Sequence, residues 1–275
     1  MMFLPGNWIS AMGHFDLVYT GDTHNLIHEL VFALIVGIAG VGLFSQLWKP
    51  KENFTGQLVA LIIWSMMILF AVITNNWVPQ PLYIIFGGLT LIATILHPVG
   101  FGLFNWIRTA KTSKILFVLV VIVAIPLLVF AFTNINSQIT NGEGSGFFHK
   151  PPVSHSGLAS EEPVNDIGSV MGDSETEHDE QEHSNAGHYR NMAIYSFIII
   201  LVGFLASFKP RGWRIAAWIA GLLPVLLGIA SIVLPEAESS LGLAWGITSI
   251  VWGVSFIAMA EFTQRNNNIS IITNT

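Results

Sequence analysis

The histidines and carboxylates at the start of the first apolar segment have residue types and a spacing that suit metal binding. Residues 22–29 read DTHNLIHE and contain Asp22, His24, His28 and Glu29. In a helix that begins here, His24 and His28 lie four residues apart on one face, so both imidazoles can bind one transition-metal ion. Asp22 or Glu29 would be a further ligand or would orient an imidazole. The alternative interpretation is a pair of solvated histidines beside a helix cap.

A second group of histidines precedes the fifth apolar segment. His188 matches His28 when residues 184–210 are aligned without gaps on residues 24–50. Two histidines at matched helix starts could share an ion with His24, or could ligate a b-type haem iron. We expect a small ion rather than haem, because haem needs a deep slot and both histidines lie near the predicted membrane surface.

His178 and His183 lie in the acidic stretch ETEHDEQEH, which ends at His183. Such a tract can bind Cu, Zn or Ni ions loosely, and its alternative interpretation is a solvated acidic linker. The chain has no cysteine, so it offers no thiolate ligand, and the identity of the metal stays open.

His97 lies inside the predicted apolar helix 81–105 and is followed by Pro98, which should kink that helix. An ionisable side chain at membrane depth is costly unless it is bonded. We consider two interpretations: a site for proton or solute transport, and a histidine that bonds a carbonyl freed by the kink. Its position is nearer the cytoplasmic side, too far from His24, His28 and His188 to join their site.

The elements that must position these residues are apolar helices long enough to cross a bilayer. Hydrophobic residues make up 52% of the 275 and charged residues 10%, against about 25% charged in soluble domains. A span needs about 20 apolar residues, and inside lipid such runs form helices. The sequence therefore predicts an all-α, multi-pass bundle of about seven transmembrane helices. The predicted spans are 26–48, 56–76, 81–105, 114–134, 190–208, 213–234 and 240–262.

Basic residues predict the orientation, because they concentrate in cytoplasmic loops. Nine of the eleven Lys and Arg residues fall in alternate loops, and only Lys150 and Arg190 fall on the opposite side. We therefore expect the N-terminus outside the cell membrane and the C-terminus inside. The nine are Lys49, Lys51, Arg108, Lys111, Lys114, Lys209, Arg211, Arg214 and Arg265.

The chain divides into an N-terminal membrane half (1–134), an external, acidic, His-rich flexible loop (135–189) and a C-terminal membrane half (190–275). The alignment of the two helix starts also matches at several further positions, which raises the hypothesis of a 3+1+3 internal repeat with the fourth helix as connector. The matched pairs are Asn25/Asn185, His28/His188, Ala33/Ala193, Ile38/Ile198, Phe44/Phe204, Lys49/Lys209 and Pro50/Pro210.

Other residues are interpreted as packing features. Glu261 and Arg265 are four residues apart, which predicts an exposed pair on one helix. Glycines in the first and third apolar segments favour close helix contacts. These glycines are Gly37, Gly40, Gly42, Gly87 and Gly88.

Several function classes are excluded or disfavoured. The net charge of −6 argues against nucleic-acid binding. No nucleotide-binding loop or hydrolase motif is present. No lysine lies centrally in a predicted helix, which excludes a retinal Schiff base. We expect a non-enzymatic membrane protein with an external His/carboxylate site for Cu or Zn, in metal handling, delivery or sensing.

Three other functions remain as alternatives: an accessory subunit of a larger membrane complex, a b-type haem electron-transfer subunit, and a small-solute or proton carrier that uses His97. The expected partners are the lipid bilayer and either other membrane subunits or a second copy of this chain.

Overall fold

The computed structural model describes residues 26–48, 50–74, 80–97, 112–141, 188–235, 237 and 240–273, and these residues form a bundle of helices. Every regular element in the described part of the chain is helical, as the sequence predicts. The helices are α3 (Leu26–Trp48), α4 (Phe54–Ile73), α5 (Gln80–Leu96), α7 (Lys114–Asn141), α9 (His188–Ser207), α10 (Trp213–Val233) and α11 (Gly242–Thr273).

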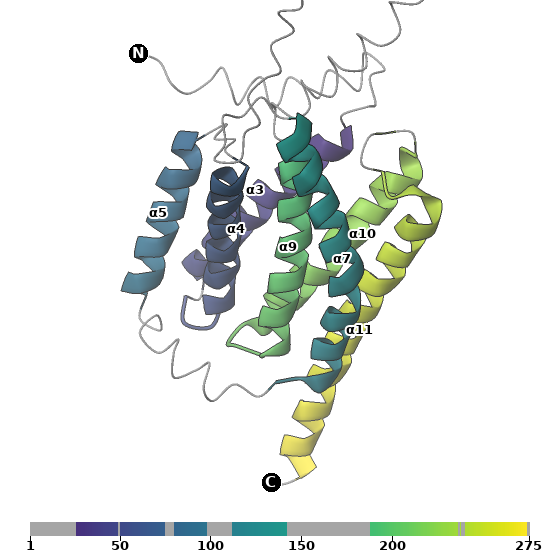
Figure 1. Cartoon of the computed structure of the whole chain (residues 1–275). Helices are drawn as coiled ribbons and strands as arrows, with labels where there is room; N and C mark the ends of the chain where they lie inside the picture. Colours follow the sequence, from purple (N-terminus) through teal and green to yellow (C-terminus); the bar gives the residue numbers. More distant parts are fainter. Residues whose placement is uncertain are drawn as a thin grey trace, which may run out of the picture.

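Successive helices alternate in direction (Figure 1). The starts of α3, α5, α9 and α11 lie at the end drawn uppermost in Figure 1, here called the upper end. The starts of α4, α7 and α10 lie at the opposite, lower end. Backbone bonds confirm the second grouping, because Ser113 N–H donates to the Ser207 carbonyl at 2.7 Å and Thr55 N–H to the Arg211 carbonyl at 3.3 Å. The basic turns at 50–53 and 208–212 therefore share one end of the bundle.

Six of the helices are long and apolar enough to cross a membrane. The exception is α5, whose apolar part, Tyr83–Leu96, is shorter. Its 17 residues span about 26 Å at 1.5 Å per residue, slightly less than a hydrocarbon core of about 30 Å. α5 ends at Leu96 and therefore covers only the first part of the predicted span 81–105, whose residues 98–105 lie outside the described residues. Pro98 explains this end, since a residue that precedes proline is disfavoured in the helical conformation.

Two helices are longer than predicted. α7 continues to Asn141 rather than 134, and α11 continues to Thr273 rather than 262. The spans were predicted from apolar runs, but a helix propagates through polar residues as long as its backbone bonds are satisfied. The first residues of the predicted external loop, from 135, are thus the last turns of α7.

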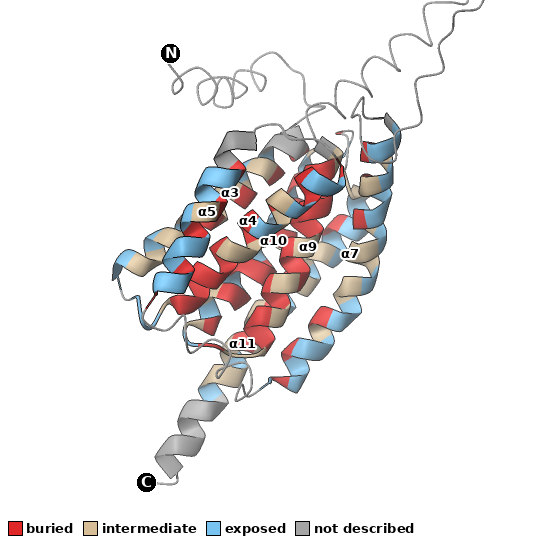
Figure 2. Cartoon of the chain, turned by 60° about the vertical axis from the view of Figure 1, so that its left-hand side comes forward, coloured by how far each residue is buried: buried red, intermediate tan, exposed pale blue. Residues whose placement is uncertain are grey.

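The distribution of buried residues matches a bundle in lipid. In α9, 83% of the membrane-spanning segment is buried inside the bundle, whereas in α7 only 17% of that segment is buried. Figure 2 shows buried residues along the inner helices α4, α9 and α10, and exposed residues along much of α5 and α7. Many of those exposed side chains are large and apolar, including Leu89, Ile92 and Ile125. The chain is therefore a multi-pass membrane protein by its fold.

Glycines bring α10 and α11 into close contact at two levels. A Cβ atom on Gly221 would lie 2.7 Å from the carbonyl oxygen of Gly253, and one on Gly228 would lie 2.5 Å from that of Gly246. Each pair is seven residues from the next on both helices, so the contacts repeat every two turns. Among the predicted packing glycines, Gly42 and Gly87 make such contacts, whereas Gly37, Gly40 and Gly88 have open space where a Cβ atom would lie.

The two matched Lys-Pro turns pack against each other at the lower end. The Thr55 hydroxyl donates to the Arg211 carbonyl at 2.5 Å. Gly212 adopts φ 78°, and a Cβ there would lie 2.6 Å from the Glu52 carbonyl oxygen, so this position requires glycine. These contacts join the α3–α4 and α9–α10 pairs. The duplication itself stays a prediction.

Candidate functional site

The two helices that carry His28 and His188 begin at the same end of the bundle. His28 lies in the first turn of α3, and His188 is the first residue of α9. α3 and α9 are in contact, and both start at the upper end (Figure 1). The side chains of His28, Glu29 and His188 are not among those described. Asp22, His24, His178 and His183 lie outside the described residues altogether.

Within the described residues, no group of three or more His, Cys, Asp or Glu side chains is close enough to bind a metal ion. That finding does not test the predicted site, because four of its residues lie outside the described ones and the side chains of His28, Glu29 and His188 are not described. The backbone therefore brings two of the predicted ligand positions to one end, and the metal site stays a prediction.

Beside this end lies a buried arginine whose role the sequence reasoning missed. Arg190 is 1% exposed and is the largest of the fully buried side chains. Its Nη2 donates to the hydroxyl of Tyr83 at 3.3 Å, and its guanidinium carbon lies 5.8 Å from the centre of that ring. Its backbone N–H donates to the side-chain oxygen of Gln138 at 3.0 Å. Tyr83, Gln138 and Arg190, here called the Arg190 cluster, join α5, α7 and α9.

Two buried amides lie near this cluster in sequence. Asn134 is one turn before Gln138 on α7, and its Nδ2 donates to the Phe130 carbonyl at 2.9 Å. Asn191 follows Arg190 and is 5% exposed, and its side-chain oxygen has no hydrogen-bond partner among the described residues. Buried polar groups are costly inside a membrane, so a concentration of them at one end marks that end as the candidate functional region.

The Arg190 cluster restricts what can bind beside it. A guanidinium is a permanent cation that binds carboxylates and phosphates through a planar fork of donors. Carboxylates are therefore compatible neighbours of Arg190, and Asp22 and Glu29 are the carboxylates of the predicted metal site.

From the sequence, Arg190 was one of two basic residues expected on the external side, and its burial was not predicted. A signal was nevertheless present, because Arg190 falls at the first position of the predicted span 190–208. A single cation inside an apolar span, on the side that is otherwise acidic, indicates burial. Tyr83, Gln138 and Asn191 carried no comparable signal, since only the helix packing brings them together.

His97 does not lie inside a kinked helix, and that prediction is wrong. It lies in a bend directly after α5, at the lower end, and is 8% exposed. Its ring packs against Phe54 with centroids 4.8 Å apart. α5 ends at Leu96, so His97 follows the described helix instead of lying within it.

Next to His97, a polar strip joins α4 to α5. The Gln57 side-chain nitrogen donates to the Thr90 carbonyl at 3.1 Å and to the Thr94 hydroxyl oxygen at 3.0 Å. Thr94 in turn donates to the Thr90 carbonyl at 2.7 Å. These bonds fasten two helices together, which is a structural role.

Glu261 pairs with Arg214 on α10, and not with Arg265 as predicted. The Arg214 guanidinium donates to both carboxylate oxygens, with Nη2 to Oε2 at 2.7 Å and Nε to Oε1 at 3.0 Å. The Trp218 indole N–H also donates to Oε1, at 2.9 Å. A planar fork from a neighbouring helix satisfies both oxygens, which one side chain on the same helix does less well. This site lies at the lower end, away from the predicted metal ligands.

Comparison of the chain with protein-family models, with curated proteins and with solved structures finds no match.

Proposed function

We propose that this membrane protein binds a transition-metal ion, Cu or Zn, at the upper end of the bundle, and that it serves in metal handling, delivery or sensing. The proposed ligands are His24, His28 and His188, with Asp22 and Glu29 as carboxylates. The supporting observation is that α3 and α9 begin at one end and pack against each other. Residues far apart in sequence, His28 and His188, are thus carried to the same region.

Asp22 and Glu29 lie next to His24 and His28 in the sequence, and they would complete the ligand set of this proposal. The tract with His178 and His183 joins the start of α9 through residues 184–187, so ions collected there would be close to the site. This arrangement suits capture from dilute solution followed by tighter binding.

Metal titration of the purified full chain tests the proposal. We expect one ion per chain from a competition titration with Zn²⁺ or Cu²⁺, and binding at least about tenfold weaker in His28→Ala and in His188→Ala. His97→Ala is the matched control, because that residue lies at the opposite end. An absence of bound ion, or unchanged affinity in His28→Ala, would overturn the proposal.

A haem group would use the same two histidines, and a visible spectrum separates the two cases. Haem-replete cells should yield a protein without a Soret band if the ligand is a small ion. The proton or solute carrier stays an alternative, and its candidate residue His97 packs against Phe54 directly after the end of α5. A chain that binds neither ion nor haem would fit the accessory-subunit alternative.

A further inference from the structure

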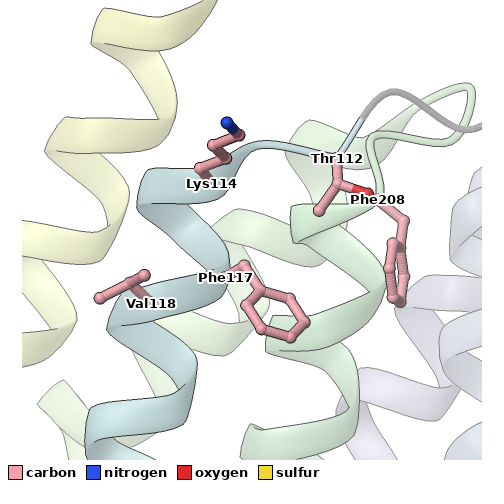
Figure 3. A pocket seen from close by; sticks show the side chains of 5 residues that line it. All are labelled: Thr112, Lys114, Phe117, Val118 and Phe208. Atoms are coloured by element: carbon pink, nitrogen blue, oxygen red, sulfur yellow. The ribbon is translucent and has the colours of Figure 1, made fainter.

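A pocket opens at the lower end of the bundle, between the start of α7 and the end of α9 (Figure 3). Its volume is about 340 Å³. The pocket lies far from the upper end, where the metal ligands are predicted, so any ligand bound there would be a different one. The residues that line it are Thr112, Lys114, Phe117, Val118 and Phe208.

The lining has an apolar part and a polar part. Phe117, Val118 and Phe208 form the apolar part, and in Figure 3 the rings of Phe117 and Phe208 flank the same space. The polar part is small: Lys114 and Thr112 lie where the chain enters α7, and Figure 3 shows the Lys114 ammonium directed away from the two rings. Val118 is 54% exposed on the outside of the bundle, so the pocket is open to the surrounding lipid. This order of apolar and polar surface matches a lipid molecule at the membrane interface.

The charge of the lower end favours an anionic headgroup. Its exposed cations include Lys51, Lys114 and Arg211, while Arg214 is paired with Glu261. Lys209 is directed elsewhere, since its ammonium lies 5.4 Å from the centre of the Trp213 ring and burial lowers its pKa. Among the described residues, Lys114 is the cation that lines the pocket. Basic pockets between transmembrane helices are typical sites for anionic lipid headgroups.

The start of α7 adds hydrogen-bond donors to this charge. The first backbone N–H groups of a helix have no acceptor within the helix and favour phosphate. Ser113 N–H is already used, because it donates to the Ser207 carbonyl at 2.7 Å. That bond ties α7 to α9 and holds the two walls of the pocket in place.

We propose that this pocket binds one anionic phospholipid of the phosphatidylglycerol type. Its phosphate lies against Lys114 and Thr112 at the start of α7, and one acyl chain lies along Phe117, Val118 and Phe208. The bound lipid would cover the seam between α7 and α9, the helix pair that links the two halves of the membrane domain. The proposal is independent of the metal site.

Native mass spectrometry of the purified full chain, titrated with phosphatidylglycerol or phosphatidylcholine, tests the proposal. We expect wild type to bind phosphatidylglycerol more tightly than phosphatidylcholine, and Lys114→Gln to lose about fivefold of that affinity, the effect of one cation near a lipid surface. Lys51→Gln is the matched control, since it removes the same charge from the same end outside the pocket. Unchanged affinity in Lys114→Gln, or an equal loss of affinity in Lys114→Gln and Lys51→Gln, would overturn the proposal that this pocket binds the lipid.

Two further experiments distinguish the binding of a lipid from the binding of a free anion. Val118→Trp narrows the apolar part and should weaken both lipids, while Val118 is exposed and its replacement leaves the fold intact. Inorganic phosphate at millimolar concentration should not displace the lipid, because the acyl chain contributes to binding. Undiminished lipid binding in Val118→Trp, or displacement by phosphate, would contradict the proposed binding mode.

Discussion

At the residue scale, Arg190 has the most unusual environment, because a charged side chain is normally exposed to water and this one is buried. It is a permanent cation with 1% exposure in the first turn of an inner helix. Such a group persists only where hydrogen bonds and charges compensate for its desolvation. The Tyr83 hydroxyl supplies one of these bonds, and the Gln138 side chain binds the backbone at the same residue. Arg190 therefore couples three helices at the end where the metal site is proposed.

Tyr83→Phe should lower the free energy of unfolding by about 1–2 kcal/mol, because it removes an oxygen that accepts a bond from a charged donor. Chemical unfolding in detergent measures this change. In an Arg190→Met background the same substitution should have little effect. An equal cost in both backgrounds would show that the hydroxyl does not act through the guanidinium.

At the element scale, the packing of α10 on α11 depends on glycines that face each other. Gly221 faces Gly253, and Gly228 faces Gly246, at distances that leave no room for a methyl group. In lipid, helix association relies on close van der Waals packing rather than on the hydrophobic effect. These two helices therefore approach closely because small residues recur every two turns on each of them.

Gly253→Ala should destabilise the protein by about 1–3 kcal/mol, since the added methyl would collide with the Gly221 carbonyl. Gly37→Ala is the matched control, because nothing lies within 4 Å of a Cβ at that helical position. Thermal unfolding in detergent compares the two variants. A Gly37→Ala protein as unstable as Gly253→Ala would indicate a general effect of removing glycine.

The ion pair between α10 and α11 contributes less than the glycines. The Arg214 and Glu261 side chains are 55% and 36% exposed, so solvent screens their attraction. A double-mutant cycle with Arg214→Gln and Glu261→Gln should give a coupling energy of at most about 1 kcal/mol. The same cycle with Arg265→Gln should give none, and a larger coupling to Arg265 would restore the pairing that the sequence suggested.

At the scale of the whole molecule, alternating helix directions place the basic turns and the histidine-bearing helix starts at opposite ends. The turns at 50–53 and 208–212 share the lower end, and the starts of α3 and α9 share the upper end (Figure 1). The positive-inside rule predicts that the lower end faces the cytoplasm. The proposed metal site would then face outward, and the lipid pocket inward.

Cysteine labelling tests this orientation directly, because the natural chain contains no cysteine. A membrane-impermeant thiol reagent added to intact cells should label Ser174→Cys, and should label Lys51→Cys and Arg211→Cys only after the membrane is opened. Labelling of Lys51→Cys in intact cells would reverse the orientation. Opposite results for Lys51→Cys and Arg211→Cys would contradict the shared lower end.

The sequence by itself determined that the described part of the chain is a bundle of apolar helices, and it located most of them; six of the seven predicted spans are helices long enough to cross a membrane. The free energy of placing a segment in lipid depends on the apolar residues of that segment itself. It can therefore be judged from the sequence without knowing which other helices pack beside it. The errors fall at helix ends, as in α5 and α7, where hydropathy and helix propagation stop at different residues. The burial of His97 was expected, but its place at the end of a helix was not.

Only the tertiary structure decided which residues meet. The Arg190 cluster draws on α5, α7 and α9, and the partner of Glu261 comes from α10, so no spacing within one segment could identify them. Helix rotation and contact depend on packing between side chains of different helices, and hydropathy does not encode these contacts. For the same reason, the sequence analysis counted Arg190 only as a basic residue on the external side and did not predict its burial among three helices.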